Sequence, residues 1–334
     1  MSLAHRARRL LAVVALALAA TAPASAATHG SAAGPKPNPN TGIVDIYTKL
    51  GFQNSQAAGT GMIVTPSGEV LTNNHVIRGA TSFRLVEVAS KRTYAATVVG
   101  YSVPEDVAVL QIADAHGLKT VRLGNSANLK LRQAVVARGN AGGRGGATVA
   151  RGLITALHRQ IVASDGEGGS ETLSNLIETD AGIEAGDSGG PLFNAAGRAI
   201  GMITAGSALQ FRNVASRGYA IRINRALTIK RQIEAGVSNE TVHVGPTAFL
   251  GITIEDAQGG VRVRGVLGGT AAEAAGLAAG DLITSLNGTT VATGDDLRTV
   301  VLALVPGATV AVAWTDGTGV ARSGQITPAE GPPQ

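Results

Sequence analysis

Three side chains that together can perform nucleophilic acyl transfer occur in separate short motifs of this chain. Ser188 lies in Gly-Asp-Ser-Gly-Gly-Pro, His75 lies in Asn-Asn-His-Val-Ile, and Asp106 opens Asp-Val-Ala-Val-Leu. A serine hydroxyl becomes an effective nucleophile when a histidine removes its proton, and a carboxylate fixes the tautomer of that histidine and stabilises its cation. We therefore predict that Ser188 is a nucleophile, His75 its base and Asp106 the orienting carboxylate.

Each of these motifs also has a simpler structural explanation. A histidine can be packed for structural reasons, an apolar run after an aspartate can be only a strand, and a glycine-rich hexapeptide can be only a turn. The glycines beside Ser188, however, let the backbone turn tightly and bring main-chain N–H groups close to a substrate oxygen. The order His, Asp, Ser, with strand-like sequence after each motif, favours a serine hydrolase site.

The elements that must position these motifs are short β-strands. From Ile43 onward, short apolar runs alternate with turn signals, and the chain contains 45 glycines and only 3% aromatic residues. This pattern is typical of an all-β sandwich or barrel. Residues 225–235 predict a helix that ends at Gly236. We expect a mainly β domain over residues 42–236.

A second folded unit is expected over residues 246–328, after a linker at residues 237–245. Several strand-like runs and a short helix near residues 271–275 fall in this part of the chain. Residues 295–305 predict a longer helix, because apolar side chains recur there on one face. The Pro-rich end of the chain is expected to be a loose tail, residues 329–334.

The start of the chain predicts export. Residues 1–26 combine a basic start, a short apolar run and small residues before Ala27, which is typical of a cleaved signal peptide. The apolar run is shorter than the ~20 residues of a membrane-spanning helix. Residues 27–41 are polar and Pro-rich, which predicts a disordered leader. We expect a secreted, extracytoplasmic protein.

Composition excludes several other classes of protein. The formal net charge of +5 includes three arginines of residues 1–26, so the mature chain carries +2. That charge is too small to favour nucleic acid binding. The chain has no cysteine, which excludes a cysteine nucleophile and stabilising disulfides. We expect no cofactor and no metal ion.

The motifs resemble those of the HtrA-type family of trypsin-fold serine proteases. Residues 71–77, 106–110 and 179–192 look like the three catalytic segments of that family, and residues 245–328 resemble its PDZ domain. The resemblance covers nearly all of the mature chain. It implies a mainly β fold of the chymotrypsin-like type: two six-stranded β-barrels with the catalytic residues in the cleft between them, followed by a PDZ domain.

The resemblance also implies roles for residues around the triad. The main-chain N–H groups of Gly186 and Ser188 would form the oxyanion hole. Thr204 would support Asp106, and the backbone of residues 204–206 would pair with an extended substrate.

A specificity pocket is implied by the same resemblance. Gly182 would lie at its floor beside Ile183, and Thr204 and Gly206 would also belong to it. No carboxylate stands at the floor position. We therefore expect cleavage after small to medium aliphatic side chains and not after Arg or Lys.

Two positions depart from the common pattern of the family. Asp187 and Ile203 each stand where many members have asparagine. In digestive relatives, an aspartate at the first of these positions pairs with a new N-terminus after zymogen cleavage. Because no basic residue precedes Ile43-Val44, we do not expect zymogen activation here.

The PDZ-like unit implies a peptide-binding site. Leu250, Gly251 and Ile252 would present N–H groups to the terminal carboxylate of a peptide. The peptide would add as a strand beside the predicted helix, with Leu297 and Val301 in its groove. The alternative is that this strand and this helix only pack in the core, because an apolar-Gly-apolar triplet is a weak signal.

These observations predict a secreted serine endopeptidase that cleaves unfolded or misfolded extracytoplasmic proteins. Its partners would be polypeptide substrates and, at the PDZ domain, peptide C-termini for recruitment or regulation, without nucleic acid or a membrane span. Homo-oligomerisation is left open. One alternative is a latent protease that acts mainly as a peptide-binding or chaperone-like scaffold, and another is an esterase with the same triad.

Overall fold

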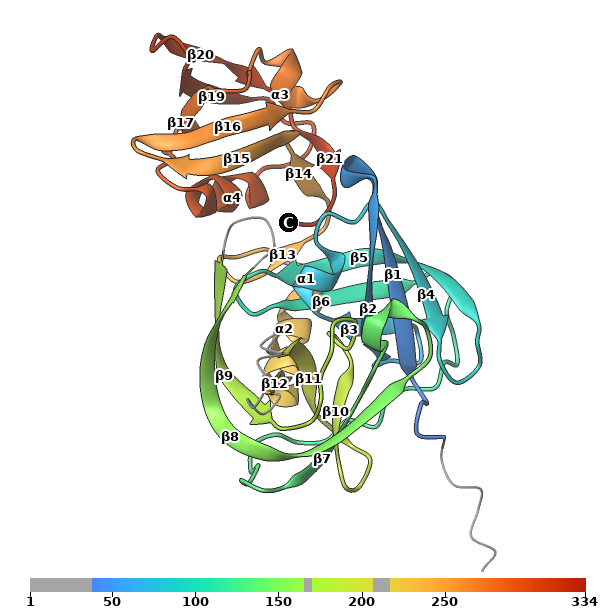
Figure 1. The fold of residues 1–334 in the computed structure, drawn as a ribbon. Helices are drawn as coiled ribbons and strands as arrows, with labels where there is room; N and C mark the ends of the chain where they lie inside the picture. Colours follow the sequence, from blue (N-terminus) through green and yellow to red (C-terminus); the bar gives the residue numbers. More distant parts are fainter. Residues whose placement is uncertain (1–37, 165–169, 207–216) are drawn as a thin grey trace, which may run out of the picture. The chain divides into compact units, whose positions relative to one another are not determined.

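The computed structural model describes residues 38–164, 170–206 and 217–334 (Figure 1). The predicted signal peptide and residues 27–37 of the predicted leader lie outside the described residues. Among the residues described, every helix is too short or too polar to span a membrane.

The first β-barrel carries two of the three predicted catalytic residues. Its antiparallel strands follow the order β5-β4-β1-β2-β3-β6, and pairing of β5 with β6 closes the barrel. Side chains such as Ile46, Leu85 and Leu110 are fully buried in its interior. The strands are β1 (Ile43–Leu50), β2 (Ser55–Ile63), β3 (Glu69–Thr72), β4 (Ser82–Glu87), β5 (Thr93–Ser102) and β6 (Val107–Ile112), with the 3-10 turn η1 (Gly51–Gln53) and the one-turn helix α1 (Asn74–Ile77) between them.

The second β-barrel carries the predicted nucleophile. It is closed in the order β10-β11-β12-β9-β8-β7. The fold is therefore mainly β with two barrels of six strands each, as predicted. Its elements are β7 (Ala134–Gly139), the 3-10 turn η2 (Ala141–Gly143), β8 (Thr148–Ser164), β9 (Ser170–Thr179), β10 (Pro191–Asn194), β11 (Ala199–Gly206) and β12 (Gly218–Arg222).

Helix α2 (Ile223–Glu234) lies close to the helix predicted from the sequence. Ile229 and Ile233 on its apolar face are buried in a core that also takes side chains from both barrels. Lys230 is buried as well, and its ammonium group contacts Glu69 of β3 at 2.8 Å and Glu234 at 2.6 Å. These ion pairs neutralise a charge that would otherwise be costly to bury.

The second predicted unit, which resembles a PDZ domain and is called the PDZ unit below, is built around a five-stranded sheet path, β15-β16-β17-β19-β20. Strand β15 lies at the edge of this sheet. Trp314 and Leu286 are buried in its core. The elements are β14 (Thr247–Phe249), β15 (Ile252–Ala257), β16 (Gly260–Val266), α3 (Ala271–Ala274), β17 (Leu282–Leu286), β18 (Thr289–Thr290), α4 (Gly294–Leu302), β19 (Val310–Thr315) and β20 (Ala321–Ile326).

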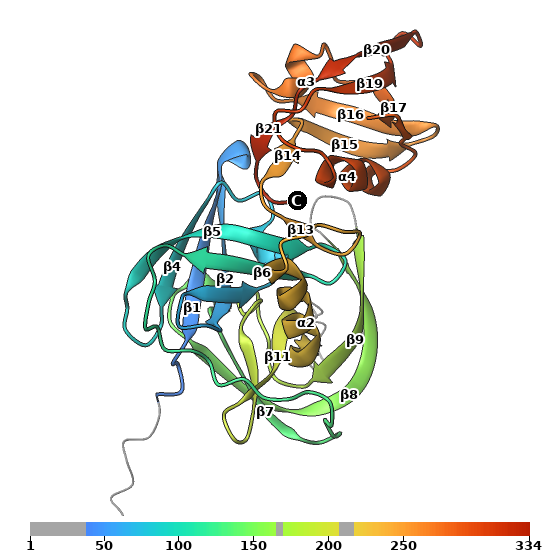
Figure 2. The same cartoon turned by 180° about the vertical axis from the view of Figure 1, so that it is seen from behind.

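The prediction of a loose tail is wrong. Residues Ala329–Gly331 form β21, which pairs with β14, and the predicted linker contains β13 (His243–Val244), which pairs with β5 (Figure 2). Pro332 and Pro333, which follow β21, are buried. Strands pair through main-chain hydrogen bonds, which do not require an alternating apolar pattern. The sequences of β13 and β21 lack such a pattern, so neither strand was predicted.

Candidate active site

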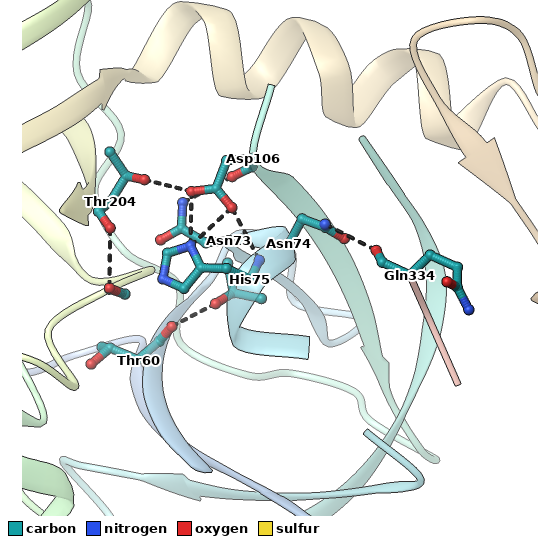
Figure 3. Close-up of polar contacts among 9 residues, drawn as sticks. Thr60, Asn73, Asn74, His75, Asp106, Thr204 and Gln334 are labelled. Carbon is teal, nitrogen blue, oxygen red and sulfur yellow. Dashed lines mark hydrogen bonds and ion pairs between the residues drawn. The ribbon is translucent and has the colours of Figure 1, made fainter. Parts of the chain in front are cut away.

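The predicted catalytic residues come from different elements: His75 and Asp106 are in direct contact (Figure 3), and Ser188 is linked to Asp106 through Thr204. His75 lies on α1, directly after β3, and Asp106 occupies the turn before β6. Ser188 lies in the loop between β9 and β10. Asp106 adopts a left-handed backbone conformation with a φ of 51°, which aspartate tolerates better than most residues. The proposed catalytic residues thus lie in or next to the connections between strands, and the strands of the two barrels position these connections.

His75 and Asp106 are joined by three hydrogen-bond contacts. The Nδ1 atom of His75 lies 2.9 Å from Oδ2 and 3.0 Å from Oδ1 of Asp106. The main-chain N–H of His75 donates to the same Oδ1 at 3.0 Å. A proton on Nδ1 that bonds to this carboxylate makes Nε2 the basic nitrogen of the neutral ring. The arrangement can therefore hold His75 in the tautomer that a general base requires.

Asp106 is buried, with 1% of its surface exposed, and two further residues hold it. The hydroxyl of Thr204 on β11 donates to Oδ2 at 2.5 Å, and the side-chain amide of Asn73 donates to the main-chain carbonyl of Asp106 at 2.9 Å. The predicted support of Asp106 by Thr204 is present in the structure. A buried carboxylate with several hydrogen-bond donors keeps a fixed orientation.

Ser188 also contacts Thr204, through the main chain of that residue. Its Oγ lies 3.3 Å from the main-chain carbonyl oxygen of Thr204, to which it donates a hydrogen bond. Its own carbonyl accepts from the N–H of Thr60 on β2 at 2.8 Å. Thr204 therefore contacts Asp106 through its side chain and Ser188 through its main chain.

Two glycines beside Ser188 have backbone geometry that excludes larger residues. Gly186 has a φ of 97°, and a Cβ atom there would lie 2.2 Å from the carbonyl oxygen of Asn140. Gly189 has a φ of 84°, and a Cβ atom there would lie 2.0 Å from the carbonyl oxygen of Thr60. Glycine is the residue that adopts such positive φ values without steric cost. The tight turn expected around the nucleophile is present.

The peptide groups of this turn are oriented by hydrogen bonds to their carbonyl oxygens. The carbonyl of Ala185 accepts from the N–H of Gly142 at 2.7 Å, and that of Asp187 accepts from the N–H of Gly190 at 2.9 Å. In a trans peptide group the C=O and the following N–H point in opposite directions. The N–H groups of Gly186 and Ser188 therefore point away from Gly142 and Gly190. This arrangement can present two main-chain donors to a developing oxyanion.

Thr60 is a site residue that the sequence did not single out for a role. Its hydroxyl donates to the carbonyl of Gly186 at 2.7 Å and accepts from the N–H of Asn140 at 2.9 Å. The hydroxyl of Thr72 donates to the carbonyl of Thr60 at 2.7 Å. Thr60 thus links the first barrel to the nucleophile turn of the second. Its only sequence signal is the Gly-Thr-Gly triplet.

Asp187, the first departure from the family pattern, is a buried carboxyl group with 3% of its surface exposed. It accepts hydrogen bonds from the N–H of Glu184 at 3.0 Å and from the hydroxyl of Thr148 at 3.1 Å. Burial raises the pKa of Asp187 above its ordinary value of 3.8, although these two hydrogen bonds act in the opposite direction and the charge of Glu184 adds to the rise. The folded state therefore holds the proton of this carboxyl group more tightly than the unfolded chain does.

Ile203, the second departure, contributes to the site through its main chain. Its carbonyl accepts from Gly189 and its N–H donates to Gly190, both at 2.8 Å. Its side chain is fully buried in the core of the second barrel. An apolar residue suits this position because the side chain lies among apolar neighbours.

The residues predicted for the specificity pocket lie near one another in the second barrel. Ile183 is buried against Gly218, where a Cβ atom would lie 2.3 Å from the Cδ1 atom of Ile183. Gly218 pairs with Gly206 in the register of β11 and β12. Gly182 is exposed, with open space where a side chain would project. Their assignment to a pocket stays a prediction.

In the PDZ unit, the predicted carboxylate-binding residues lie between β14 and β15. Gly251 has a φ of 83°, and its carbonyl accepts from the N–H of Leu267 at 2.8 Å. Leu250 is buried, and Ile252 opens the edge strand β15. The side chains of Leu297 and Val301 on α4 are buried in the core, as the alternative of simple packing describes. Their groove role stays a prediction.

The chain matches two known domain families. Residues 59–202 match the trypsin-like peptidase domain, and residues 248–316 match the PDZ domain. Serine protease PepD of Mycobacterium tuberculosis is 31% identical over 298 residues, which cover 85% of this chain and 63% of PepD. Serine protease Do-like HtrA of Bacillus subtilis is 35% identical over 245 residues, covering 69% of this chain and 54% of that protein.

A solved structure is similar over most of the chain. The HtrA-type protease AlgW with a tripeptide has a TM-score of 0.51 and 27% sequence identity, and the match covers 88% of this chain and 95% of AlgW. This chain spans 63% of the length of PepD and 54% of that of the Bacillus protein.

Proposed function

Because the chain belongs to the HtrA-type family of trypsin-fold serine proteases with a PDZ domain, we propose that it is a serine endopeptidase. Ser188 attacks the carbonyl carbon of the scissile peptide bond, and His75 takes the proton from its Oγ. The observation that carries this proposal is the contact of His75 Nδ1 with both carboxylate oxygens of Asp106, at 2.9 and 3.0 Å. Thr204 connects that carboxylate to Ser188.

The reaction proceeds through an acyl-enzyme. The N–H groups of Gly186 and Ser188 stabilise the oxyanion, and protonated His75 returns its proton to the leaving amine. Water then attacks the ester on Ser188 with His75 as base, which releases the acid product and restores the serine. Asp106 stays ionised and stabilises the imidazolium in both steps.

The proposed substrates are unfolded or misfolded extracytoplasmic polypeptides. Strand β10 pairs with β11 only as far as Met202, so main-chain groups from Thr204 onward are placed to pair with an extended segment. A folded protein offers few such segments. The uncharged residues Gly182 and Ile183 favour an aliphatic side chain at the cleavage site. AlgW has been solved with a tripeptide, which supports peptide binding in this fold.

The PDZ unit is proposed to bind peptide C-termini for recruitment or regulation. Strand β15 lies at the edge of its sheet, which leaves an edge for strand addition beside α4. Leu250 to Ile252 at the start of that strand would receive the carboxylate. Isothermal titration with peptides that carry free or amidated C-termini tests this role, and equal binding of both would contradict it.

Export through a cleaved signal peptide is proposed from residues 1–26. N-terminal sequencing of protein recovered outside the cytoplasm should begin near Ala27. A protein that retains Arg6 to Arg9 would contradict the proposal.

The first test of the proposed activity is labelling of the purified protein with a fluorophosphonate probe, beside a Ser188→Ala variant. Rapid labelling of the unmodified protein and its loss in the variant, together with casein cleavage, support the endopeptidase. A folded protein that neither labels nor cleaves casein would support the scaffold alternative. Labelling and ester hydrolysis without peptide cleavage would support the esterase.

A further inference from the structure

The residues that follow β21 contact the helix that carries His75. We call residues 332–334 the strap. The carbonyl of Pro333 accepts from the N–H of Gly79 at 2.8 Å, and the carbonyl of Gln334 accepts from the side-chain amide of Asn74 at 3.1 Å (Figure 3). Asn74 is the first residue of α1, and Gly79 follows its C-cap, Arg78. The strap therefore holds both ends of a helix that contains His75.

Helix α1 has little support of its own. It has four residues, and its N-cap residue, Asn73, makes no side-chain capping bond. The amide of Asn73 bonds instead to the main chain of Asp106. A single helical turn is not stable in isolation, because the entropic cost of forming it exceeds the gain from one hydrogen bond. Tertiary contacts must therefore keep α1 in place, and the strap supplies two of them.

The strap is itself held by Tyr101 of β5. The N–H of Gln334 donates to the hydroxyl oxygen of Tyr101 at 3.2 Å, and Tyr101 is fully buried. The same hydroxyl lies 3.0 Å from the hydroxyl of Thr247, the first residue of β14. Tyr101 pairs in register with Ala108 on β6, the strand that begins just after Asp106. The strap thus rests on a strand that also borders the catalytic carboxylate.

We propose that the strap is a positioning element that keeps His75 aligned with Asp106 and Ser188, an inference that rests on the proposed function. No atom of the strap takes part in the chemistry. Its effect passes through α1, because the strap's main-chain carbonyls accept from the side-chain amide of Asn74 at one end of the helix and from the N–H of Gly79 just beyond the other. A displacement of a catalytic group by about 1 Å can cost up to about a hundredfold in rate. Loss of a support at both ends of α1 should therefore lower turnover more than substrate binding.

The main test compares the full chain with a chain that ends at Gly331, which retains β21. For a short peptide substrate, kcat and the second-order rate of fluorophosphonate inactivation should each fall about tenfold. KM should change by less than about twofold, because the hydrogen bonds of the strap are with Asn74, Gly79 and Tyr101, whereas the turn with Ser188 belongs to the second barrel. Glu330→Ala, whose exposed side chain lies on β21, is the matched variant that should keep full activity. Unchanged kcat and labelling in a folded shortened chain would overturn the proposal.

A second variant separates positioning from a general loss of structure. Asn74→Asp replaces the amide that bonds to the strap by a carboxylate of the same shape. In the full chain it should lower kcat, but by less than the shortening does, because the bond between Gly79 and Pro333 remains. In the chain that ends at Gly331 it should add less than a twofold loss, because the contact is already absent. If the fold-loss in kcat of the shortened Asn74→Asp chain equalled the product of the two separate fold-losses, Asn74 would act independently of the strap.

Hydrogen exchange tests the strap without reference to activity. The N–H of Arg78 bonds to the carbonyl of Asn74 and closes the turn of α1. Its exchange should be at least about tenfold faster in the shortened chain, while amides in β8 and β9 exchange at an unchanged rate. If the full chain neither reacts with the probe nor cleaves peptides, the proposed function fails. The exchange rate of Arg78 still shows whether the strap holds α1 in place. Equal exchange of Arg78 in both chains would overturn it.

Discussion

Thr204 contacts two of the three proposed catalytic residues. Its hydroxyl holds Asp106 and its carbonyl receives the hydroxyl of Ser188. The main-chain contact survives any substitution, whereas the contact with the carboxylate depends on the side chain. The two contributions can therefore be separated by changing the side chain alone.

We expect Thr204→Val to lower kcat/KM roughly ten- to hundredfold, because a hydrogen bond to a charged group contributes about 1.5–3 kcal/mol. Thr204→Ser keeps the hydroxyl and should retain most of the activity. Steady-state hydrolysis of a peptide substrate measures both variants. Equal activity of the valine and serine variants would show that Asp106 does not need this donor.

Asp187 gives a prediction about pH. Its pKa in the folded state is raised by burial, so the folded protein binds this proton more tightly than the unfolded chain. Its contribution to stability is then complete below the ordinary pKa of 3.8 and is lost as pH rises through the folded-state pKa. Asp187→Asn removes that loss, because an amide does not ionise.

The melting temperature of Asp187→Asn should therefore exceed that of the unmodified protein at pH 7. The difference should shrink as pH falls toward 4, where the carboxyl group is increasingly neutral. Calorimetric scans between pH 4 and pH 8 measure it. A constant difference across this range would mean that Asp187 does not titrate with a raised pKa.

At the scale of elements, β2 has a function beyond completing its barrel. Thr60 lies on it, and its hydroxyl connects the carbonyl of Gly186 with the N–H of Asn140. The carbonyl of Gly186 belongs to the peptide group that precedes Asp187, so this contact helps to fix the turn that carries the proposed oxyanion donors. A strand of one barrel thereby shapes the nucleophile turn of the other.

Thr60→Val should lower kcat up to about a hundredfold, since loss of one oxyanion-hole donor costs on that order or more. Thr60→Ser retains the hydroxyl and should stay within a fewfold of the unmodified protein. Peptide hydrolysis under saturating substrate is the measurement. An unchanged KM beside the lower kcat is expected, because the side chain supports the transition state and not the bound peptide.

Much of the site could be predicted from the sequence, for a chemical reason. The proposed chemistry requires a serine, a histidine and an aspartate, so the motifs that contain Ser188, His75 and Asp106 can be recognised in the sequence alone. Thr60 could not be predicted in the same way, because its role depends on which carbonyl its hydroxyl meets. The same limit applies to β21, whose partner β14 lies at the far end of the PDZ unit in sequence.

At the scale of the whole molecule, the two barrels and α2 together form a hydrophobic core that is separate from the cores inside each barrel. Met62 and Val109 from the first barrel, Met202 from the second and Ile229 from α2 are buried in it together. A core that draws on both barrels couples their stabilities. We therefore expect the barrels to unfold in one cooperative transition.

Ile229→Ala should destabilise this core by about 2–5 kcal/mol, since the side chain is fully buried and its removal leaves a cavity. Urea unfolding, followed by circular dichroism and by the fluorescence of a probe on the second barrel, measures the change. Both signals should shift together. Separate transitions would show that the barrels unfold independently.

The strap also has a consequence for how its sequence can vary. The hydrogen bonds described for Pro333 and Gln334 are made by main-chain atoms. Contacts of this kind are indifferent to the identity of a side chain but sensitive to the number of residues between two fixed points. Selection should therefore act on the spacing between β21 and the residue that reaches Asn74. Among homologues, substitutions at position 334 should accumulate freely, whereas insertions and deletions after β21 should be rare.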